Sequence, residues 1–524
     1  MSLTSFLKRM GQKHTLSVAI KKKVDAIHED PDGRIGIAID ALRDLENTMG
    51  VTENMSAFAD WLENNPGAKA WFTNLFRRDP EVVKKFFLNF LVNVNLKWLA
   101  NIHDNADDAY GFSTPYTILM SPTMRCNLNC KGCYASQYSR QDELPTDEID
   151  RIVTEGKELG TFFYTLLGGE PMVRWNDLWK IMRKHDDCLF QMFTNASLIS
   201  DEVADQMLKL GNVYPVLSVN GWQDATDASR GDGAFQQIVD AADRLRERGL
   251  VFGNSFVFMR SNFEDLTQDA FYDFWIDRGS FFAWNFLYMP VGRDPNLELM
   301  PTPEQRREMG EFVRSLRERK PFFLMDFWND APAVGGCIAG GRRYIHITHE
   351  GDVEPCIFAH FATDNIHGKS LKQVLTSDFL TDIRMHQPHS DNLLTPCMII
   401  DNPHVLREVV ERHKAYSTDG NSQDLLTNHA GELDEYAQNV HACLDPVWAR
   451  TFPKKHEEMQ SEEGLHSGEV DRLTLARDPV IAEEVSVAYP FVDEYPWIAG
   501  KRPDTLVAGA AGHCRTRAGR AAKT

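Results

Sequence analysis

The stretch Arg125-Cys-Asn-Leu-Asn-Cys-Lys-Gly-Cys-Tyr134 holds three closely spaced cysteines and decides the fold class of this 524-residue chain. It places Cys126, Cys130 and Cys133 in a CxxxCxxC spacing. Three thiolates so close together can hold three corners of a cubane iron–sulfur cluster and leave the fourth iron without a protein ligand. A zinc or redox site is the alternative, but zinc prefers CxxC pairs and four closed ligands. The spacing therefore favours a cluster with one open iron.

This stretch, with the aromatic Tyr134 directly after the last cysteine, resembles the cluster motif of the radical S-adenosylmethionine (radical SAM) enzymes. The resemblance implies that Cys126, Cys130 and Cys133 hold a 4Fe–4S cluster whose open iron binds the methionine part of SAM, with Tyr134 beside the cofactor. It also implies that one electron cleaves SAM to a 5′-deoxyadenosyl radical, which removes hydrogen from an unactivated C–H bond. An electron donor such as flavodoxin or ferredoxin is then a required partner.

Short apolar runs alternate with amphipathic helical patterns after residue 115. We expect strands at 116–120, 162–167, 188–193, 213–219, 251–259 and 281–289. Helices are expected between them, centred near Ile152, Trp179, Ala204, Ala241 and Phe271. Six strand–helix units in succession predict a parallel sheet with right-handed crossovers. Radical SAM enzymes have a partial barrel of six such units, so the predicted fold class is α/β, a partial (β/α)6 barrel.

A Gly168-Gly-Glu-Pro171 segment follows the second expected strand. Ligands of parallel sheets collect at the carboxyl ends of the strands. Glycines let the backbone approach a ligand closely, and a carboxylate accepts hydrogen bonds from an ammonium group. In radical SAM enzymes a GGEP segment contacts the SAM amino group, so the resemblance implies cofactor contacts for Gly168, Gly169, Glu170 and Pro171. An ordinary turn is the alternative for the tetrapeptide taken alone.

Polar residues also end the third and fourth expected strands. Ser218-Val-Asn-Gly221 ends the fourth, and Arg230-Gly231 follows it. Radical SAM enzymes place such residues near the SAM ribose and carboxylate, which implies cofactor contacts for Ser218, Asn220 and Arg230. Asn220 stands where Asp is commoner; it keeps the hydrogen-bonding capacity without a charge. Thr194-Asn-Ala196 ends the third strand, where many relatives have Thr-Asn-Gly. Turn chemistry without a ligand is the alternative for all of them.

A second group of cysteines, Cys337, Cys356 and Cys397, lies downstream. With Gly351, the first two form a C-x13-G-x4-C pattern that resembles the opening of the SPASM and twitch extensions, which bind auxiliary iron–sulfur clusters. A complete SPASM module uses seven cysteines for two clusters, so three well-placed cysteines predict one auxiliary cluster. Cys443, a histidine such as His360, a neighbouring carboxylate or the substrate could supply the fourth ligand. A domain that keeps the fold without a cluster is the remaining alternative.

Composition narrows the class of protein and its partners. With 43% apolar and 25% charged residues, the chain is typical of a globular protein. The net charge of −20 argues against a nucleic-acid partner, because phosphate binding needs a basic surface. Nine cysteines grouped in cluster motifs indicate reduced thiols, and the first residues resemble no secretory signal. We therefore expect a cytoplasmic protein.

The predicted domain organisation has five parts. They are a helical domain at 1–112, the radical SAM barrel at 113–320, a SPASM/twitch-like domain at 321–415, a helical segment at 416–500 and a disordered tail at 501–524.

The sequence leaves the substrate open. The apolar segment 86–98 is interrupted by asparagines and is too short for a membrane span, so it predicts a buried helix or one that contacts a membrane surface or a substrate. If it guides a long hydrocarbon chain, the substrate is a lipid or hydrocarbon that undergoes C–C coupling or modification. A SPASM-type peptide or protein maturase is the alternative. A non-catalytic iron–sulfur scaffold is the alternative of another class.

Overall fold

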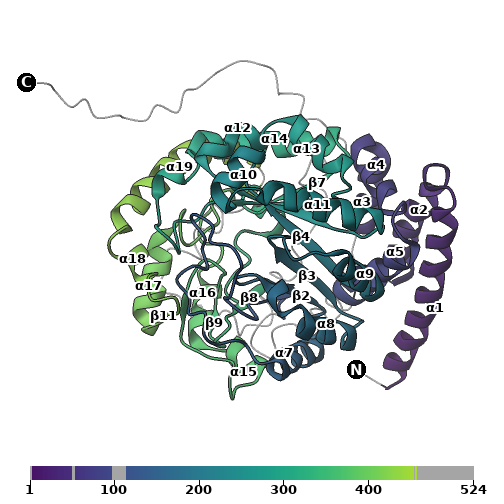
Figure 1. The fold of residues 1–524 in the computed structure, drawn as a ribbon, viewed down its shortest axis with the longest axis horizontal. Coiled ribbons are helices and arrows are strands. Elements are labelled where there is room, and N and C mark those ends of the chain that lie inside the picture. The colour runs from purple at the N-terminus through teal and green to yellow at the C-terminus, as the bar shows by residue number, and fades with distance from the viewer. Residues whose placement is uncertain (1–2, 50–53, 97–113, 454, 457–524) are drawn as a thin grey trace, which may run out of the picture.

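A nine-stranded sheet forms the centre of the molecule, with helices packed around it (Figure 1). The structure, a computed structural model, describes residues 3–49, 54–96, 114–453 and 455–456. Neighbouring strands are parallel except for the last two, which pair antiparallel. Their order in the sheet is β7 (Phe323–Asp326), β6 (Phe282–Leu287), β5 (Gly253–Phe258), β4 (Val213–Val219), β3 (Leu189–Thr194), β2 (Phe163–Leu166), β1 (Thr117–Met120), β8 (Tyr344–Ile347) and β9 (Val353–Glu354).

Strands β1 to β6 and the helices between them confirm the predicted strand–helix alternation. Each lies where the apolar runs predicted it. The connecting helices near the predicted centres are α7 (Thr146–Leu159), α8 (Trp175–Lys184), α9 (Asp201–Leu210), α11 (Ala234–Glu247) and α13 (Asp269–Asp277). Local signals fix their ends: at α9 the Ser200 side chain accepts a hydrogen bond from Val203 N, and Gly211 ends the helix with φ 65°.

Three strands of the sheet were not predicted. β7 extends the sheet beyond β6, while β8 pairs with β1 and carries β9 on its far side. β7 and β8 are as long as β1 and β2, four residues each, but they lie beyond the six strand–helix units, so the alternation did not report them. Through β8, the region with the second cysteine group shares its backbone hydrogen bonding with the barrel.

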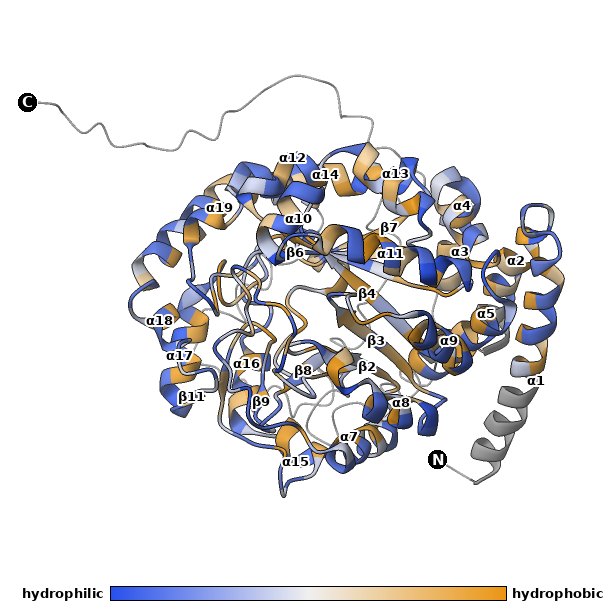
Figure 2. Ribbon diagram, viewed as in Figure 1, coloured by the Kyte–Doolittle hydropathy of each residue, from blue (hydrophilic) through white to orange (hydrophobic). Residues whose placement is uncertain are grey.

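The two faces of the sheet have different surroundings. On the outer face, the Tyr164 hydroxyl of β2 bonds to Val153 O of α7, and Phe256 of β5 packs against Phe271 of α13. Successive strand residues point to opposite faces. Val257 and its register partner Phe286 in β6 therefore face inward. Figure 2 shows apolar residues concentrated on the strands, while the helices alternate between apolar and polar residues.

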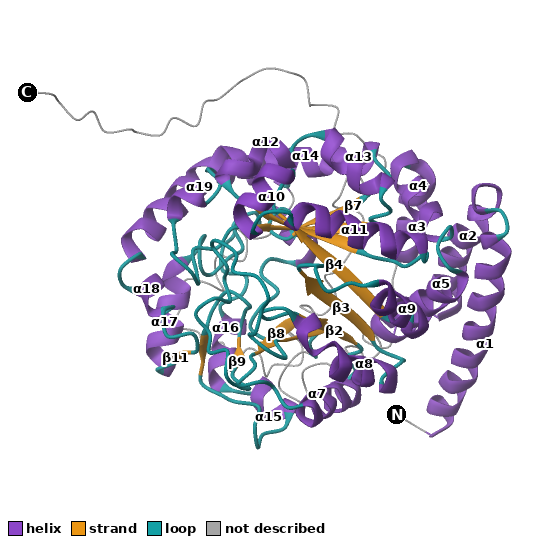
Figure 3. Cartoon of the chain, viewed as in Figure 1, coloured by secondary structure: helices purple, strands orange, loops and turns teal. Residues whose placement is uncertain are grey.

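In the part of the chain that the structure describes, six helical segments precede the sheet and lie at its amino-terminal edge. Trp71 Nε1 donates to Phe281 O just before β6, and Asn89 Nδ2 donates to Cys188 O just before β3. In Figure 3 they lie on the opposite side of the molecule from the region where most loops gather. They are α1 (Leu3–His28), α2 (Pro31–Met49), α3 (Asn54–Asn64), α4 (Pro66–Leu75), α5 (Pro80–Phe86) and the π-helix η1 (Phe87–Leu96).

The position of η1 bears on the substrate hypothesis. Asn89 is 3% exposed and donates to Cys188 O, and Asn93 Nδ2 donates to Asp187 O, so these two asparagines bond to backbone carbonyls before β3. The described part of the segment is therefore a partly buried helix at the amino ends of the strands, whereas ligands of such sheets bind at the carboxyl ends. The position of this helix therefore does not support the prediction that it guides a hydrocarbon substrate.

The remaining elements are the other connections between strands and the segments that follow β9 in the chain. The predicted helix near 431–443 is present and longer, as part of α19, and the predicted tail at 501–524 lies outside the described residues. Among the described helices, none is long and apolar enough to cross a membrane. The elements are α10 (Gln223–Arg230), α12 (Phe263–Leu266), α14 (Pro303–Arg319), α15 (Leu371–Leu375), α16 (Asp378–Met385), α17 (Pro403–His413), α18 (Gln423–Leu426), α19 (Ala430–Thr451), β10 (Phe361–Ala362), β11 (Tyr416–Ser417) and the short 3-10 helices η2 (Pro171–Arg174), η3 (Arg260–Asn262), η4 (Leu297–Leu299) and η5 (Ala331–Val334).

Candidate cluster and cofactor site

Cys126, Cys130 and Cys133 lie on the loop that follows β1, with half-exposed side chains. The Cys126 sulfur accepts hydrogen bonds from Leu128 N at 3.4 Å and from Asn195 Nδ2 at 3.8 Å. Burial raises the pKa of the Cys126 and Cys133 thiols. A positive group that takes up the thiolates, such as the iron of a cluster, would reverse that effect.

The GGEP segment packs directly on this cysteine loop. Gly169 N donates to Thr123 O and Glu170 N to Arg125 O, each at 2.9 Å. Gly168 has a φ of 117°, in the region that favours glycine, and a Cβ on Gly169 would lie 2.4 Å from Arg125 O. Both glycines are therefore required by the close approach of two backbones. Pro171 begins the short helix η2.

Glu170 is almost fully buried at the carboxyl ends of β2 and β3, with 1% of its surface exposed. Its Oε1 accepts from Met172 N at 3.0 Å and Thr194 Oγ1 at 2.8 Å, and its Oε2 accepts from Asn195 N at 2.7 Å. Burial raises the pKa of Glu170 to about 7 despite these donors. A carboxylate has about four acceptor positions, so one remains for a ligand.

The residues after β3 connect Glu170 to the cysteine loop. Asn195 Nδ2 donates to Asn127 Oδ1 at 2.9 Å, and Asn127 Nδ2 donates to Ser197 Oγ at 2.8 Å. Ala196 has a left-handed φ of 68°, which explains why a glycine suits this position. The sequence left the role of Thr194-Asn-Ala196 open; the structure places it within the site.

Arg230, Asn220 and Ser218 approach from β4 and α10. Arg230 Nε donates to Asn220 Oδ1 at 2.6 Å, and Ser218 is half-buried on the inner face of β4. The Arg230 charge opposes the burial-driven rise in the pKa of both Cys133 and Glu170, so its guanidinium is within electrostatic reach of both. The structure therefore brings Arg230 to the side of the cysteine loop, and its contact with SAM stays a prediction.

Arg293, on the loop after β6, is a contact that sequence reasoning missed. Its backbone N donates to Cys133 O at 3.2 Å, and its Nη1 donates to Cys130 O at 3.4 Å. A Cβ on Gly292 would lie 2.3 Å from Cys133 O, so this loop presses against the cysteine loop. The signal available in the sequence was a glycine–arginine pair just beyond a strand end. The segments that follow β2, β3, β4 and β6 thus converge on the cysteine loop after β1.

The second cysteine group gathers around Tyr344 in β8. The Tyr344 hydroxyl donates to Cys356 Sγ at 3.0 Å. Burial raises the pKa of Tyr344, and the thiolates of Cys356, Cys337 and Cys397 raise it further, so all three sulfurs lie within electrostatic reach of its hydroxyl. The structure therefore brings together the three cysteines that the spacing singled out.

Two of the fourth-ligand alternatives have defined surroundings. Both ring nitrogens of His360 are engaged: Nδ1 lies 2.7 Å from Asp419 Oδ2, and Nε2 donates to Ile357 O at 3.0 Å. The neighbouring carboxylate is Asp401, which accepts from Cys397 N at 3.1 Å and from Arg306 Nη1 at 2.6 Å. His360 therefore supports the loop and is not free to bind iron here.

A buried polar network joins the two cysteine-bearing regions. Tyr138, five residues after Cys133, donates its hydroxyl to Glu354 Oε1 at 2.5 Å. Glu354 Oε2 lies 2.6 Å from His346 Nδ1, and His346 Nε2 lies 2.7 Å from Ser121 Oγ at the end of β1. Tyr138 is 3% exposed, and the other three side chains are fully buried. We call Ser121, Tyr138, His346 and Glu354 the polar bridge.

Comparison with known protein families identifies both cysteine regions. Residues 120–271 match the radical SAM superfamily, and residues 337–398 match the SPASM iron–sulfur cluster-binding domain. The chain is a radical SAM enzyme with a SPASM domain. A radical SAM domain binds a 4Fe–4S cluster and SAM, and a SPASM domain is an additional iron–sulfur cluster-binding domain.

Curated relatives of this radical SAM enzyme are themselves enzymes. The chain is 29% identical to mycofactocin maturase MftC of Mycolicibacterium smegmatis over 51% of this chain and 69% of the relative. It is 24% identical to the AdoMet-dependent heme synthase of Methanosarcina barkeri, over 50% and 82%. It is 26% identical to PqqA peptide cyclase of Bradyrhizobium diazoefficiens, over 50% and 71%. Among solved structures, Streptococcus suis SuiB bound to precursor peptide SuiA has a TM-score of 0.45 at 19% identity, over 60% and 82%.

The donor set of the radical SAM domain fits a cubane cluster. Among the residues that the structure describes, no three His, Cys, Asp or Glu side chains converge to hold a single metal ion. A cubane binds each thiolate at a different iron, so three spaced thiols on one loop suit it better than they suit a mononuclear site. The buried Glu170 with a remaining acceptor position is a matching feature for the SAM ammonium group.

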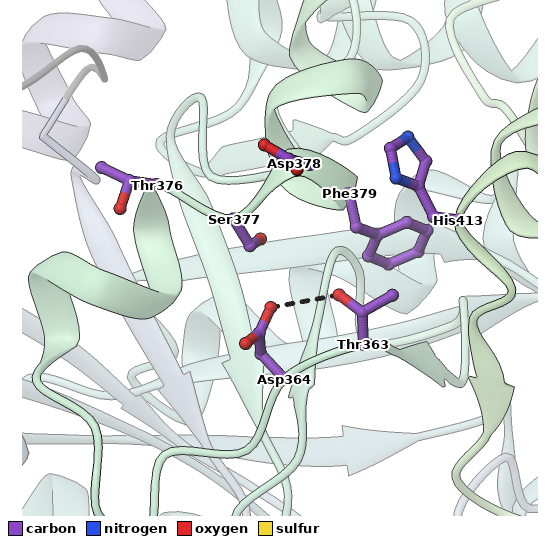
Figure 4. A pocket seen from close by; sticks show the side chains of 7 residues that line it. All are labelled: Thr363, Asp364, Thr376, Ser377, Asp378, Phe379 and His413. Carbon is purple, nitrogen blue, oxygen red and sulfur yellow. Dashed lines mark hydrogen bonds between the residues drawn. The ribbon is translucent and has the colours of Figure 1, made fainter.

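A surface pocket of about 390 Å³ lies apart from these residues (Figure 4). Its lining includes Thr363 and Asp364 after β10, Asp378 and Phe379 of α16, and His413 at the end of α17. Thr363 Oγ1 donates to Asp364 Oδ2 at 3.1 Å, the bond drawn in Figure 4. None of the predicted site residues lines this pocket, so it is separate from the cluster site.

Proposed function

We propose that this radical SAM enzyme modifies a peptide or protein substrate at an unactivated C–H bond. The observation that supports this is the match of a radical SAM domain and a SPASM domain to relatives that include a peptide cyclase and a maturase. The lipid or hydrocarbon substrate expected first from the sequence has less support, because its structural ground was the segment now found at the amino ends of the strands. The peptide alternative takes its place.

Cys126, Cys130 and Cys133 are the proposed ligands of the SAM cluster. When bound, the cluster and SAM would supply one electron and a carbon radical able to remove hydrogen from the substrate. Glu170 accepts a hydrogen bond from the SAM ammonium group, and Arg230 pairs with the SAM carboxylate. Ser218 and Asn220 accept from or donate to the ribose hydroxyls, with Asn220 also holding Arg230 in place.

The backbone and neighbouring side chains keep this arrangement rigid. Gly168 and Gly169 allow the Glu170 segment to lie on the cysteine loop, and Asn195 ties Glu170 to Asn127. Tyr134 closes one side with its hydroxyl 3.5 Å from Gly168 O. Groups held this way need little reorganisation when the cofactor arrives, and they exclude water from the reacting atoms.

Cys337, Cys356 and Cys397 are the proposed ligands of an auxiliary cluster. Asp401 holds the backbone of Cys397, and its salt bridge with Arg306 is buried on both sides. Tyr344 donates a hydrogen bond to Cys356, which stabilises its thiolate. A flavodoxin or ferredoxin is the proposed electron donor.

Co-expression with short peptides encoded beside the gene tests the proposed substrate class. We expect mass spectrometry to show one peptide with an altered mass when the wild-type enzyme is present, and an unaltered mass when Cys126→Ala replaces it. A heme precursor or a lipid that is converted in cell extract, with every neighbouring peptide unaltered, would overturn the peptide assignment.

A further inference from the structure

Aromatic side chains form one connected group between the two cysteine-bearing loops. Phe286 lies at its centre, with ring-centroid distances of 5.8 Å to Trp284 and 5.6 Å to Phe327. Phe358 lies 6.5 Å from Phe286 and 5.7 Å from Tyr134. We call this group the aromatic cluster, and its members are Tyr134, Phe193, Trp284, Phe286, Phe327 and Phe358.

The aromatic cluster spans the inner face of the sheet. Phe193 of β3 and Phe286 of β6 lie 6.0 Å apart, although β4 and β5 separate their strands in the sheet. Such a contact requires that the sheet curve around the space between them. Tyr134 directly follows Cys133, and Phe358 comes two residues after Cys356. The cluster therefore lies where both proposed iron–sulfur ligand sets meet the barrel interior.

These rings keep part of their surface accessible in the interior. All six are half-buried, whereas the outer-face residues Tyr164, Phe190 and Phe256 are 0% exposed. The register of the sheet places Gln191, Ser218 and Ser255 on the same inner face. No inner-face residue of β3, β4, β5 or β6 carries a charge. These four inner strand faces thus present partly exposed apolar and uncharged polar surface.

We propose that the aromatic cluster binds an uncharged aromatic or large aliphatic side chain of the substrate and holds it between the two cysteine groups. This inference rests on the proposed function, in which the substrate is a peptide or protein. Burying apolar surface against these rings is favourable, and offset or edge-on packing adds to it for an aromatic ring. A carboxylate would lose its hydration and would meet only neutral donors on these strands, such as Ser218, Ser255 and Trp284 Nε1. A cation could be attracted to the ring faces, so it is the competing occupant.

Equilibrium dialysis on reconstituted, SAM-loaded enzyme tests this preference under anaerobic conditions. The probes are N-acetyl-Gly-X-Gly-amide peptides with Tyr, Leu, Lys or Glu at X, together with p-cresol, which carries the tyrosine ring alone. We expect the Tyr and Leu peptides to bind at least fivefold more tightly than the Lys and Glu peptides. The Phe286→Ala variant should weaken Tyr-peptide and p-cresol binding at least fivefold, with Phe358→Ala as a second variant on a loop.

Phe312→Ala is the matched control. Phe312 is also half-buried, but it lies on α14 against Tyr272 of the outer layer, so its loss should leave probe binding unchanged. Tightest binding by the Lys peptide, or unchanged Tyr-peptide binding in both cluster variants, would overturn the proposal. So would a loss of SAM affinity with probe binding intact, because the rings would then serve the cofactor.

The results of these experiments distinguish a failure of the aromatic preference from a failure of the proposed peptide function. If p-cresol binding depends on Phe286 while no peptide binds, the aromatic preference stands and the peptide assignment fails. If a peptide encoded beside the gene is modified, but p-cresol does not bind and the four probe peptides bind equally, the peptide assignment stands and the aromatic preference fails.

Discussion

Glu170 is the residue whose ionisation should control SAM binding. Burial raises its pKa to about 7, and a SAM ammonium group requires its carboxylate form. Lowering the pH below 7 protonates Glu170, so SAM affinity should fall roughly tenfold per pH unit, since each unit costs about 1.4 kcal/mol. Calorimetric titration of SAM between pH 6 and 7.5 measures this.

The Glu170→Gln variant should weaken SAM binding and remove its pH dependence. Losing one charge-assisted hydrogen bond costs about 1.5–3 kcal/mol, which corresponds to roughly tenfold to a hundredfold weaker binding. Glu158→Gln on the exposed side of α7 is the control and should behave as wild type. Equal SAM affinity of the wild type at pH 6 and 7.5 would show that Glu170 does not meet the ammonium group.

Ala196 carries a backbone cost that a glycine would relieve. A φ of 68° destabilises the folded state by about 1–2 kcal/mol for a residue with a Cβ. Glycine removes this strain, but its greater conformational freedom in the unfolded chain costs about 0.5–1 kcal/mol on folding. Ala196→Gly should therefore stabilise the protein by about 0.5–1 kcal/mol in urea unfolding. Ala228→Gly inside α10 should instead destabilise it by a similar amount. A loss of stability in both variants would contradict the account of Ala196.

The polar bridge ties two elements that are far apart in the chain. Tyr138→Phe keeps the ring and removes the hydroxyl that bonds to buried Glu354. We expect the free energy of unfolding to fall by about 1.5–3 kcal/mol, because the acceptor is a carboxylate without access to water. Denaturant unfolding of the iron-free protein provides the measurement.

Tyr416→Phe is the control for the polar bridge. Its hydroxyl bonds to Asp352 Oδ1 at 2.6 Å, but Tyr416 is 46% exposed, and Asp352 keeps a second donor in Asn365 Nδ2 when the hydroxyl is lost. The expected loss is therefore below about 1 kcal/mol. An equal decrease in the free energy of unfolding in the two variants would show that the burial of Glu354 does not strengthen the polar bridge.

At the same scale, the sequence predicted elements better than it predicted their partners. The alternating runs located β1 to β6 because each buried strand is a local pattern. The pairing of β8 with β1 and the Tyr138–Glu354 bond join residues more than 200 positions apart, and no local periodicity reports them. The cysteine spacing and GGEP marked the site, since cofactor chemistry fixes those residues. Arg293 and Asn195 act through contacts that only the folded loops create.

For the whole molecule, two cluster sites should be counted by iron content. Reconstituted wild-type protein should hold about eight irons, and the variant with Cys337, Cys356 and Cys397 replaced by Ala should hold about four, on the four-iron count of a cubane. That variant should retain SAM cleavage, because the barrel keeps its own three cysteines. Four irons in the wild type, with a single type of cluster in its Mössbauer spectrum, would reduce the SPASM domain to a structural cap.

The most direct test of the account is formation of 5′-deoxyadenosine. Reconstituted protein is incubated anaerobically with SAM and dithionite, and the nucleoside is measured by liquid chromatography with mass spectrometry. The account predicts 5′-deoxyadenosine from the wild type and none from the variant with Cys126, Cys130 and Cys133 replaced by Ala. Equal amounts from both proteins, or none from a wild type that holds its full iron, would contradict it.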